Sequence, residues 1–345
     1  MKKLEFPDIK PLVVDKYCQI ISTGIGLPEE VISNQYIIDE YNLLASDRAV
    51  QYSLGIKERR WANSDEKLED LMALAVKECL DKADMDINQI NRVIYSKLSG
   101  DYQVPATSIG LMKKLGATVG IPAFDITSAC SGFIHAMDLA IRYIASGDDY
   151  VIIVGGSVMG EPLLDDEKSS QYNIFLFGDA IAAMLLGPSD IEKIISTYIV
   201  TSHGLYDNAY IEYGTSLLKE GLTDIKAANI IMKISDGRII HDSSVEYSRV
   251  VADKLLSLTE FSIDDLDFFV TSDQSTGIWQ DQLKTLGIPE EKSTSLYYKH
   301  GNTVAAMSPL NLHELIESGR LKRGDLVMMQ AHGAGASSGG VLFRY

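Results

Sequence analysis

Cys130 is the residue of this chain best placed by its neighbours to act as a nucleophile. It stands in the run Asp125-Ile126-Thr127-Ser128-Ala129-Cys130-Ser131-Gly132-Phe133. This pattern predicts that a strand ends, that small residues make a tight turn, and that a helix begins near the cysteine, as in a nucleophile elbow. The positive end of the helix dipole favours thiolate over thiol, so we expect a lowered pKa. The alternative, a small buried cysteine, is what we expect of Cys18 and Cys79.

A second polar turn lies in the later part of the chain, at Lys299-His300-Gly301-Asn302-Thr303. The side-chain amide of Asn302 can donate a hydrogen bond to a thioester or enolate oxygen. The alternative is a helix N-cap, a common task of asparagine.

A glycine-rich run, Ala331-His332-Gly333-Ala334-Gly335-Ala336-Ser337-Ser338-Gly339-Gly340, separates the last two expected strands. Bare backbone amides at Gly333, Ala334 and Gly335 suit an oxyanion hole or the close approach of a substrate. The alternative is a tight β-connection. The run lacks the Lys-Ser/Thr pair of a nucleotide phosphate loop.

The elements that must position these residues occur twice in the same order. In the first half, helices and strands are expected over residues 66–83, 92–95, 105–115, 122–126, 132–146, 150–154 and 180–186. In the second half, the same order is expected over residues 243–258, 267–270, 278–286, 294–297, 303–318, 325–329 and 340–344. Such alternation indicates layered α/β structure with mostly parallel strands. We expect two halves, residues 1–189 and 190–345, related by a pseudo-twofold axis, with Cys130 facing Asn302 where they meet.

Composition excludes several function classes. The chain has 345 residues, is 46% hydrophobic and carries a net charge of −17. This acidity disfavours a nucleic-acid or anionic-membrane partner, and no apolar run approaches the ~20 residues of a membrane span. The first twenty residues contain no apolar leader, and the three cysteines form neither a disulfide framework nor a metal motif. We therefore expect a cytoplasmic protein with a usable thiol and no bound metal.

Together, these segments resemble beta-ketoacyl-ACP synthase III of the thiolase superfamily. The resemblance is carried by the Cys130 turn, Phe177-Gly178-Asp179-Ala180, His300-Gly301-Asn302-Thr303, the glycine-rich run and Leu54-Gly55-Ile56-Lys57-Glu58-Arg59-Arg60. It implies a thiolase-like duplicated fold with α-β-α-β-α layers. It also implies a cysteine that takes an acyl group from coenzyme A or acyl carrier protein, after which malonyl-ACP decarboxylates and attacks the acyl-enzyme.

In that family the cysteine works with a histidine and an asparagine. Cys130 and Asn302 match the first and last members. Where the family has His-Gln, this chain has Asp273-Gln274, so the resemblance puts Asp273 in the place of the histidine. An ionised carboxylate would repel an enolate, whereas Asp273 could act as a base, or as a donor if its pKa were strongly raised. The alternative is a turn or cap aspartate.

The resemblance assigns further residues. His332 falls where the family has a phenylalanine beside the catalytic cysteine, so it could deprotonate an acceptor or activate Cys130. Val104 falls where a bulky aromatic bounds the acyl pocket, which leaves room for a longer or branched acyl group. Three basic residues are candidates for a pantetheine or phosphate entrance: Lys57, Arg59 and Arg60.

Three functions follow from this reading. The first is condensation by a ketosynthase III-like enzyme in fatty-acid or specialised acyl or polyketide biosynthesis. The second is an O- or N-acyltransferase on the same scaffold, in which His332 or Asp273 deprotonates a hydroxyl or amine acceptor. The third is a non-catalytic partner subunit of a condensing enzyme. All three imply a homodimer or a heterodimer, no tightly bound cofactor, and an acyl-CoA or acyl-ACP donor in the two catalytic cases.

Overall fold

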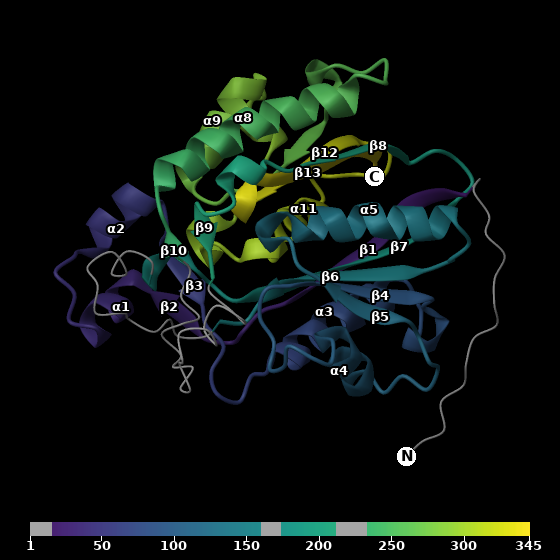
Figure 1. Cartoon of the computed structure of the whole chain (residues 1–345), viewed down its shortest axis with the longest axis horizontal. Coiled ribbons are helices and arrows are strands. Elements are labelled where there is room, and N and C mark those ends of the chain that lie inside the picture. The colour runs from purple at the N-terminus through teal and green to yellow at the C-terminus, as the bar shows by residue number, and fades with distance from the viewer. Residues whose placement is uncertain (1–15, 160–173, 212–232) are drawn as a thin grey trace.

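The chain folds into two β-sheets with helices between them and on both outer faces (Figure 1). The computed structural model describes residues 16–159, 174–211 and 233–345, so the first fifteen residues lie outside it. Helices α5 (Gly132–Ala145) and α11 (Met307–Glu317) form the layer between the sheets. This is the duplicated, layered α/β fold that the sequence predicts. The expectation of mostly parallel strands is wrong, because both sheets mix parallel and antiparallel pairs.

The first sheet is built from residues 17–189 and has the strand order β1-β7-β6-β4-β5. Its strands are β1 (Tyr17–Gly26), β4 (Arg92–Lys97), β5 (Ala123–Ile126), β6 (Val151–Ser157) and β7 (Ala180–Ser189). Strand β4 pairs in parallel with β5 and β6, whereas β7 runs antiparallel to both β6 and β1.

The second sheet is built from residues 194–344 and has the order β11-β12-β13-β8. Its strands are β8 (Ile194–Val200), β11 (Phe268–Val270), β12 (Leu326–Gly333) and β13 (Ser337–Arg344). β11 and β12 are parallel, and β13 is antiparallel to β12 and β8. Strands β11, β12, β13 and β8 therefore repeat β4, β6, β7 and β1 in order and direction.

Among the described residues, the second sheet has no counterpart of β5, and the predicted strand 294–297 is wrong. Short helix α10 (Tyr297–His300) begins there instead. Side chains take the polar groups that a strand ladder would use: the N–H of Leu296 donates to Oδ1 of Asn311 at 2.9 Å, and Ser295 donates to Asp273. These bonds hold the segment against α11.

Four longer helices cover the outer faces of the sheets. They are α3 (Leu68–Lys82) and α4 (Thr107–Lys114) on the first sheet, and α8 (Gly237–Leu256) and α9 (Thr276–Leu286) on the second. Helix α3 buries one face at helical spacing, through Leu68, Leu71, Met72, Ala75, Val76 and Cys79. Helix α8 begins earlier than the predicted residue 243, because the Asp236 side chain accepts the N–H of Arg238 at 2.9 Å and caps the helix there.

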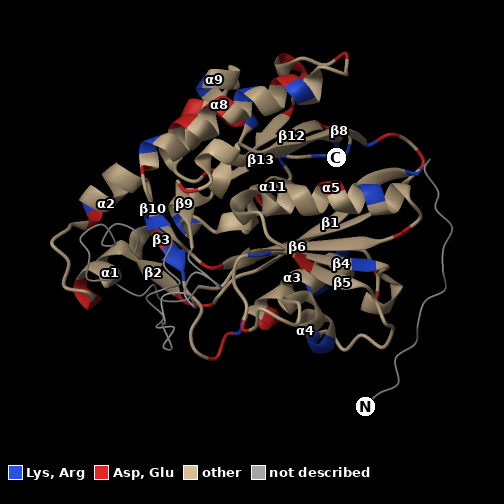
Figure 2. Ribbon diagram, viewed as in Figure 1, with Lys and Arg blue, Asp and Glu red and all other residues tan. Residues whose placement is uncertain are grey.

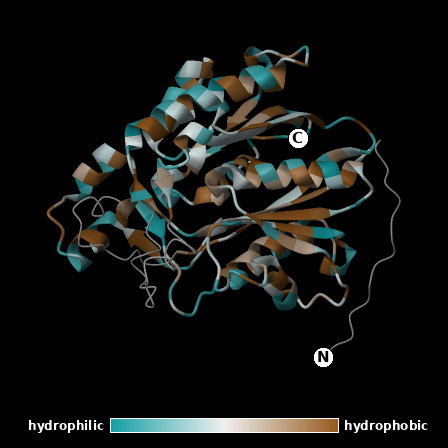
Figure 3. Ribbon diagram, in the orientation of Figure 1, coloured by the Kyte–Doolittle hydropathy of each residue, from teal (hydrophilic) through white to brown (hydrophobic). Residues whose placement is uncertain are grey.

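The apolar residues concentrate in the strands and the central helices. Every residue of β6 is buried, as expected of a strand covered on both faces. Figure 3 shows the central strands mostly as hydrophobic, and in the ribbon of Figure 2 most charged positions lie on outer helices and loops. Among the described residues, no helix combines the length and apolar character that crossing a membrane would require.

Short elements complete the structure. They are β2 (Val31–Ser33), α1 (Asn34–Glu40), α2 (Asp47–Leu54) and β3 (Glu58–Arg60), which lie together at one end of the molecule, and the pair β9 (Ala209–Tyr210) and β10 (Lys233–Ile234).

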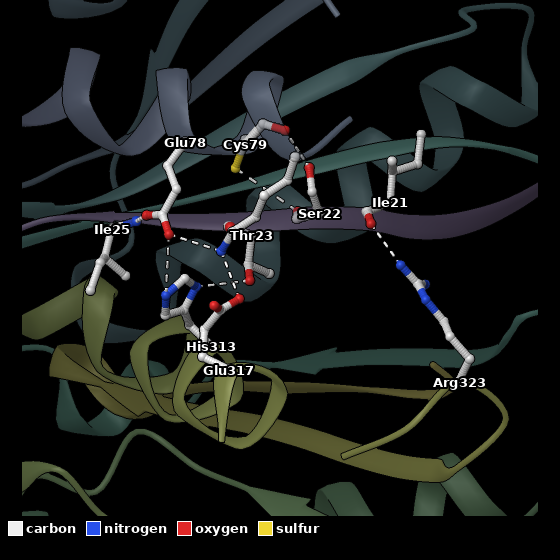
Figure 4. Close-up of polar contacts among 10 residues, drawn as sticks. Ile21, Ser22, Thr23, Ile25, Glu78, Cys79, His313, Glu317 and Arg323 are labelled. Carbon is white, nitrogen blue, oxygen red and sulfur yellow. Dashed lines mark hydrogen bonds and ion pairs between the residues drawn. The ribbon is translucent and has the colours of Figure 1, made fainter. Parts of the chain in front are cut away.

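A polar cluster ties the central helix of the second half to the first half (Figure 4). The ring of His313 on α11 hydrogen-bonds Thr23 of β1 at 2.9 Å. Lys82 at the end of α3 bridges Glu78 at 2.8 Å and Glu317 of α11 at 2.7 Å. Because the cluster joins both halves at the β1 edge, it favours their behaving as one folding unit.

Candidate active site

Cys130 lies at the turn between β5 and α5, as the small residues around it predict. The turn contains a short 3₁₀ helix, η2 (Ala129–Ser131), directly before α5. Ala129 has a φ of 46°, a left-handed conformation that L-residues rarely adopt. Cys130 follows it and is 8% exposed. A strained residue beside a nucleophile is a common mark of a functional site.

Three serine hydroxyls fasten this turn to the second half of the chain. Ser128 Oγ and Ser131 Oγ lie 3.1 Å and 3.0 Å from Ser337 Oγ at the start of β13. Ser131 also donates to the carbonyl of Ser128 at 2.9 Å. The position of Cys130 is therefore fixed relative to the glycine-rich run that precedes β13.

Gly333 brings that run against the nucleophile. A Cβ added to Gly333 would lie 3.0 Å from the backbone nitrogens of both Cys130 and Ser131. Further along, Gly335 has a φ of 71°, and a Cβ added there would meet nothing within 4 Å. Gly333 thus permits the close approach, while half-buried Ala334 and Gly335 border open space. The assignment of their amides as oxyanion donors stays a prediction.

The expected low pKa of Cys130 is corrected by the structure, because burial raises the pKa of the thiol from 9.0 to about 12. That rise corresponds to about 4 kcal/mol, whereas a helix N-terminus supplies roughly 1 kcal/mol. The Gln274 side chain lowers the pKa in part. Burial therefore outweighs the dipole, and Cys130 is a thiol at neutral pH.

The Asn302 side chain bonds the backbone of its own turn through its oxygen. Its Oδ1 accepts the N–H of Val304 at 2.8 Å, directly before the 3₁₀ helix η7 (Val304–Ala306), whose N-cap is Thr303. No described residue accepts a hydrogen bond from its Nδ2. Helices η2 and η7 lie against each other, so the two turns meet as the duplication predicts. Because Oδ1 is bonded to Val304, the orientation of the amide is fixed.

Asp273 is fully buried, and its carboxylate is occupied. Asn311 Nδ2 donates to its Oδ1 at 2.5 Å, and Ser295 donates to Oδ2. Burial raises its pKa from 3.8 to about 7, although these hydrogen bonds oppose the rise. These hydrogen bonds hold the Asp273 carboxyl group against α11 and the segment before α10. Its role in place of a histidine stays a prediction.

Gln274 is the site residue that the sequence reading used only as an anchor. It is half-buried, and its Nε2 donates to the backbone carbonyl of His332. The signal for it was its place directly after a buried strand, where polar side chains of parallel sheets gather.

His332 points away from Cys130, which corrects its proposed place beside the cysteine. Successive strand residues face opposite sides, so the Gly333 contact with Cys130 sends His332 to the α8 side. Its ring nitrogens bond Ser338 at 2.6 Å and Ser243 of α8 at 3.1 Å, and Tyr247 stacks on it. Burial lowers its pKa to about 4. The ring is a neutral packing element.

The three basic candidates for a phosphate entrance differ in how far they are exposed. Arg59 is 0% exposed, and its guanidinium donates to the Ile32 and Phe175 carbonyls, so it belongs to the core rather than to an entrance. Arg60 is half-buried and donates to the carbonyl of Pro28 at 2.6 Å. Lys57 is exposed, and its assignment stays a prediction.

Val104 is 82% exposed, so it bounds no pocket formed by the described residues of this chain. It lies on the loop between β4 and α4, together with Tyr102, which is 66% exposed. The expectation that Val104 shapes the acyl pocket is therefore corrected for the single chain.

Within the described ranges, no three His, Cys, Asp or Glu side chains are grouped so that they could hold a metal ion.

Comparison with known proteins decides the family. The 3-Oxoacyl-[acyl-carrier-protein (ACP)] synthase III family matches residues 124–203, and its C-terminal part matches residues 256–345. A beta-ketoacyl-[acyl-carrier-protein] synthase III of Blochmanniella floridana is 31% identical over 330 residues, which cover 95% of this chain and 100% of the relative. The chain belongs to the 3-oxoacyl-[acyl-carrier-protein] synthase III family.

Other relatives agree. The synthase III of Xanthomonas oryzae pv. oryzae is 30% identical, with 95% of this chain and 98% of the relative covered. The crystal structure of the Aquifex aeolicus synthase III has a TM-score of 0.84 and 29% identity over 95% of this chain and 100% of that one. A priming beta-ketosynthase of the R1128 polyketide pathway has the same fold, with a TM-score of 0.87, 24% identity and coverage of 98% and 99%.

Family membership confirms the thiolase-like fold and makes the chain a condensing-type acyltransferase. The matched regions contain the candidate site: Cys130 lies in the first, and Asp273, Gln274 and Asn302 lie in the second.

Proposed function

We propose that this chain joins an acyl group held on Cys130 to a malonyl thioester, as a ketosynthase III-type condensing enzyme. The observation that carries the proposal is the convergence of both halves on one sulfur. Gly333 of the second half lies against the backbone of Cys130, and the free Nδ2 of Asn302 comes from the turn that packs on the Cys130 turn. A thiol nucleophile between backbone amides and a fixed amide donor suits acyl transfer.

The first step is thioester exchange. The sulfur of Cys130 attacks the donor carbonyl, the donor sulfur leaves, and the thiol proton ends on the released thiol. Because the thiol is buried and its pKa is about 12, it remains protected by its proton until a donor occupies the site.

The second step forms the carbon–carbon bond. The malonyl thioester loses CO₂, and its enolate carbon attacks the acyl carbonyl on Cys130. The sulfur leaves and is reprotonated, and a β-ketoacyl thioester is released. Asn302 Nδ2 is the donor we assign to the enolate oxygen, which carries charge only as the reaction proceeds.

The relatives are named for an acyl carrier protein, and we propose such a carrier for the extender thioester here. The donor is a coenzyme A or carrier-protein thioester, and no tightly bound cofactor is needed. We place the reaction in the cytoplasm, where a reducing environment keeps the free thiol of Cys130 usable.

We also propose a homodimer. Strand β5 pairs only with β4, so one edge of the first sheet is unpaired within the described chain, and all four of its residues are half-buried. Tyr102 and Val104 are exposed on the neighbouring loop. A second copy would cover this edge and bring Val104 to a subunit boundary.

The test is intact-protein mass spectrometry after incubation with panels of acyl-CoA and acyl-ACP donors. We expect one acyl adduct on the wild type and on Cys18→Ala, a matched control that removes another buried thiol, and none on Cys130→Ala. Adding malonyl-ACP should then release CO₂ and remove the adduct.

Two other results would replace the proposal. An adduct that passes to a hydroxyl or amine without CO₂ release would mark an O- or N-acyltransferase. An unmodified Cys130 with every donor would mark a non-catalytic subunit.

A further inference from the structure

Ser337, the first residue of β13, faces the turn that carries Cys130. In the antiparallel pairing of β12 and β13 it lies directly opposite Gly333. Residues that oppose each other in such a pair present their side chains on the same face of the sheet. The next pair, His332 and Ser338, bonds to each other on the α8 side. Gly333 and Ser337 therefore lie together on the face that meets the Cys130 turn.

Three hydroxyl groups form a triangle where β13 meets this turn. The Ser337 oxygen lies 3.1 Å from the Ser128 oxygen and 3.0 Å from the Ser131 oxygen, and the last two are 3.3 Å apart. Ser131 also donates to the Ser128 carbonyl at 2.9 Å. Among the described residues, the contacts of Ser337 are the side-chain hydrogen bonds that join the turn to β13. Removing this hydroxyl group would release the turn from the strand.

The segment that the triangle holds is strained. Ser128 and Ser131 stand on either side of Ala129 and Cys130, and Ala129 has a φ of 46°. A conformation that L-residues rarely adopt persists only where the surrounding structure holds it in place. Because both flanking hydroxyl groups contact Ser337, this one side chain holds both ends of the strained segment.

We propose that Ser337 is a positioning residue, whose hydroxyl group holds the Cys130 turn against β13 so that the sulfur meets the donor carbonyl in the geometry of attack. Reacting atoms must lie about 3–3.5 Å apart with their orbitals aligned, and an error of about 1 Å can cost about a hundredfold in rate. Ser337 acts through Ser128 and Ser131. Its effect on acylation rests on the proposed function, whereas its hold on the turn does not.

The same hydrogen bonds keep the thiol buried. If they are lost, the turn opens more often, and a small reagent reaches the sulfur more easily. The pKa of the Cys130 thiol is raised to about 12 by burial, so opening also increases the fraction of thiolate. Loss of the Ser337 hydroxyl group should therefore have opposite effects on two reactions of one sulfur. Attack on an acyl donor slows, and alkylation by a small reagent becomes faster.

The test compares Ser337→Ala with Ser338→Ala. The control removes the hydroxyl group of the next strand residue, which is also buried and bonds the His332 ring at 2.6 Å on the opposite face. Acylation of Cys130 is followed by intact mass over a range of concentrations of a donor that modifies the wild type. Iodoacetamide alkylation of Cys130 is followed, without donor, by the mass of the peptide that carries it.

We expect the saturating acylation rate of Ser337→Ala to fall about tenfold, with an unchanged half-saturating donor concentration, because the turn and not the donor site is disturbed. Alkylation should become about fivefold to tenfold faster, the change expected when one hydrogen bond no longer opposes a local opening. Ser338→Ala should match the wild type in both reactions. The urea midpoints of the two variants should shift by similar amounts.

A second set of variants removes the partners of Ser337. Ser128→Ala/Ser131→Ala should reproduce the changes seen in Ser337→Ala, and it keeps the test decisive if Ser337→Ala is unfolded. Adding Ser337→Ala to this pair should change neither rate further, because residues that act through one contact are not additive. Alkylation that stays constant up to about 1 M urea identifies a local opening, whereas global unfolding would make it rise steeply.

A wild-type rate of either reaction in Ser337→Ala would overturn the proposal. So would equal effects in Ser338→Ala, additive effects in the triple variant, or alkylation that rises steeply with urea. If no donor acylates the wild-type protein, the proposed condensation is lost, and the alkylation rates alone decide whether Ser337 holds the turn.

Discussion

The two turns that meet at the centre of the molecule have matching backbones but different chemistry. In the first half Ala129 has a φ of 46° and η2 leads into α5. In the second half Val304 has a φ of 57° and η7 leads into α11. Aligned on these left-handed residues, Cys130 corresponds to Ala305.

The surroundings of the two turns differ. Gly333 lies against Cys130, and the run beyond it is open at Gly335. Ala305 is 1% exposed and lies against β6, where a Cβ added to Gly155 would be 3.2 Å from its carbonyl oxygen. The second turn instead offers Asn302, which lies before the left-handed residue and not after it. The duplication therefore gives both turns the same backbone conformation. Their side chains and the strand beside them differ, so one turn presents a thiol and the other an amide donor.

Removing the donor from the second turn should have the largest effect. Asn302→Asp keeps an oxygen that can accept the N–H of Val304, and it replaces Nδ2 with a negatively charged oxygen. We expect CO₂ release to fall by about 10²–10³-fold, the usual loss for an oxyanion donor, while the urea midpoint changes little. Asn302→Ala, which also loses the bond from the N–H of Val304, should be less stable by about 1 kcal/mol. If Asn302→Asp turned over as fast as the wild type, Asn302 would not be the hydrogen-bond donor to the enolate oxygen.

Closing the gap beside the first turn should have the next largest effect. In Gly333→Ala the new methyl would lie 3.0 Å from two backbone nitrogens, so the Cys130 turn must shift by a few tenths of an ångström. We expect acylation, measured by intact mass against time, to slow by about tenfold to a hundredfold. Gly277→Ala is the matched control, since the nearest atom to its methyl would be 3.9 Å away. Wild-type kinetics in Gly333→Ala would mean that the contact does not constrain the nucleophile.

The sequence predicted the order of the helices and strands better than the side-chain contacts in which the two turns differ. Cys130 and the order of strands follow from small residues and apolar runs, which are local signals. The side that His332 faces depends on strand phase, and an error of one residue reverses it. The burial of Arg59 and the bond from Gln274 to the His332 carbonyl depend on segments far apart in the chain. The failed strand 294–297 reflects Asn311, which bonds the backbone that a sheet would have used.

The loops after the matching strands β4 and β11 extend the comparison. At the end of β4, Lys97 pairs with Asp125 at 3.5 Å, whereas after β11 the partners of the buried Asp273 among the described residues are hydroxyl, amide and backbone groups. Since its pKa is raised from 3.8 to about 7, the folded protein holds a proton that the unfolded chain releases, and wild-type stability is lost as pH rises from about 4 to 7. Asp273→Asn should gain stability over the wild type across that window, by up to about 4 kcal/mol. Urea unfolding at several pH values measures the difference, and a gap that does not change with pH would refute the ionisation argument.

The smallest effect is expected from moving the thiol to the second turn. The double variant Cys130→Ala/Ala305→Cys places sulfur at the corresponding position of the repeated backbone, behind α5 and β6 and without Gly333 beside it. If access and the surrounding donors make the nucleophile, this thiol should remain unacylated by every donor that modifies the wild type. The extra sulfur in a packed site should cost about 1 kcal/mol or slightly more in unfolding free energy. Intact mass after incubation with donor reads out the result, and Cys130→Ala alone supplies the baseline. An acyl adduct on the introduced thiol would mean that the turn geometry common to both halves is sufficient for reactivity, and that the strand and side chains around Cys130 only tune it.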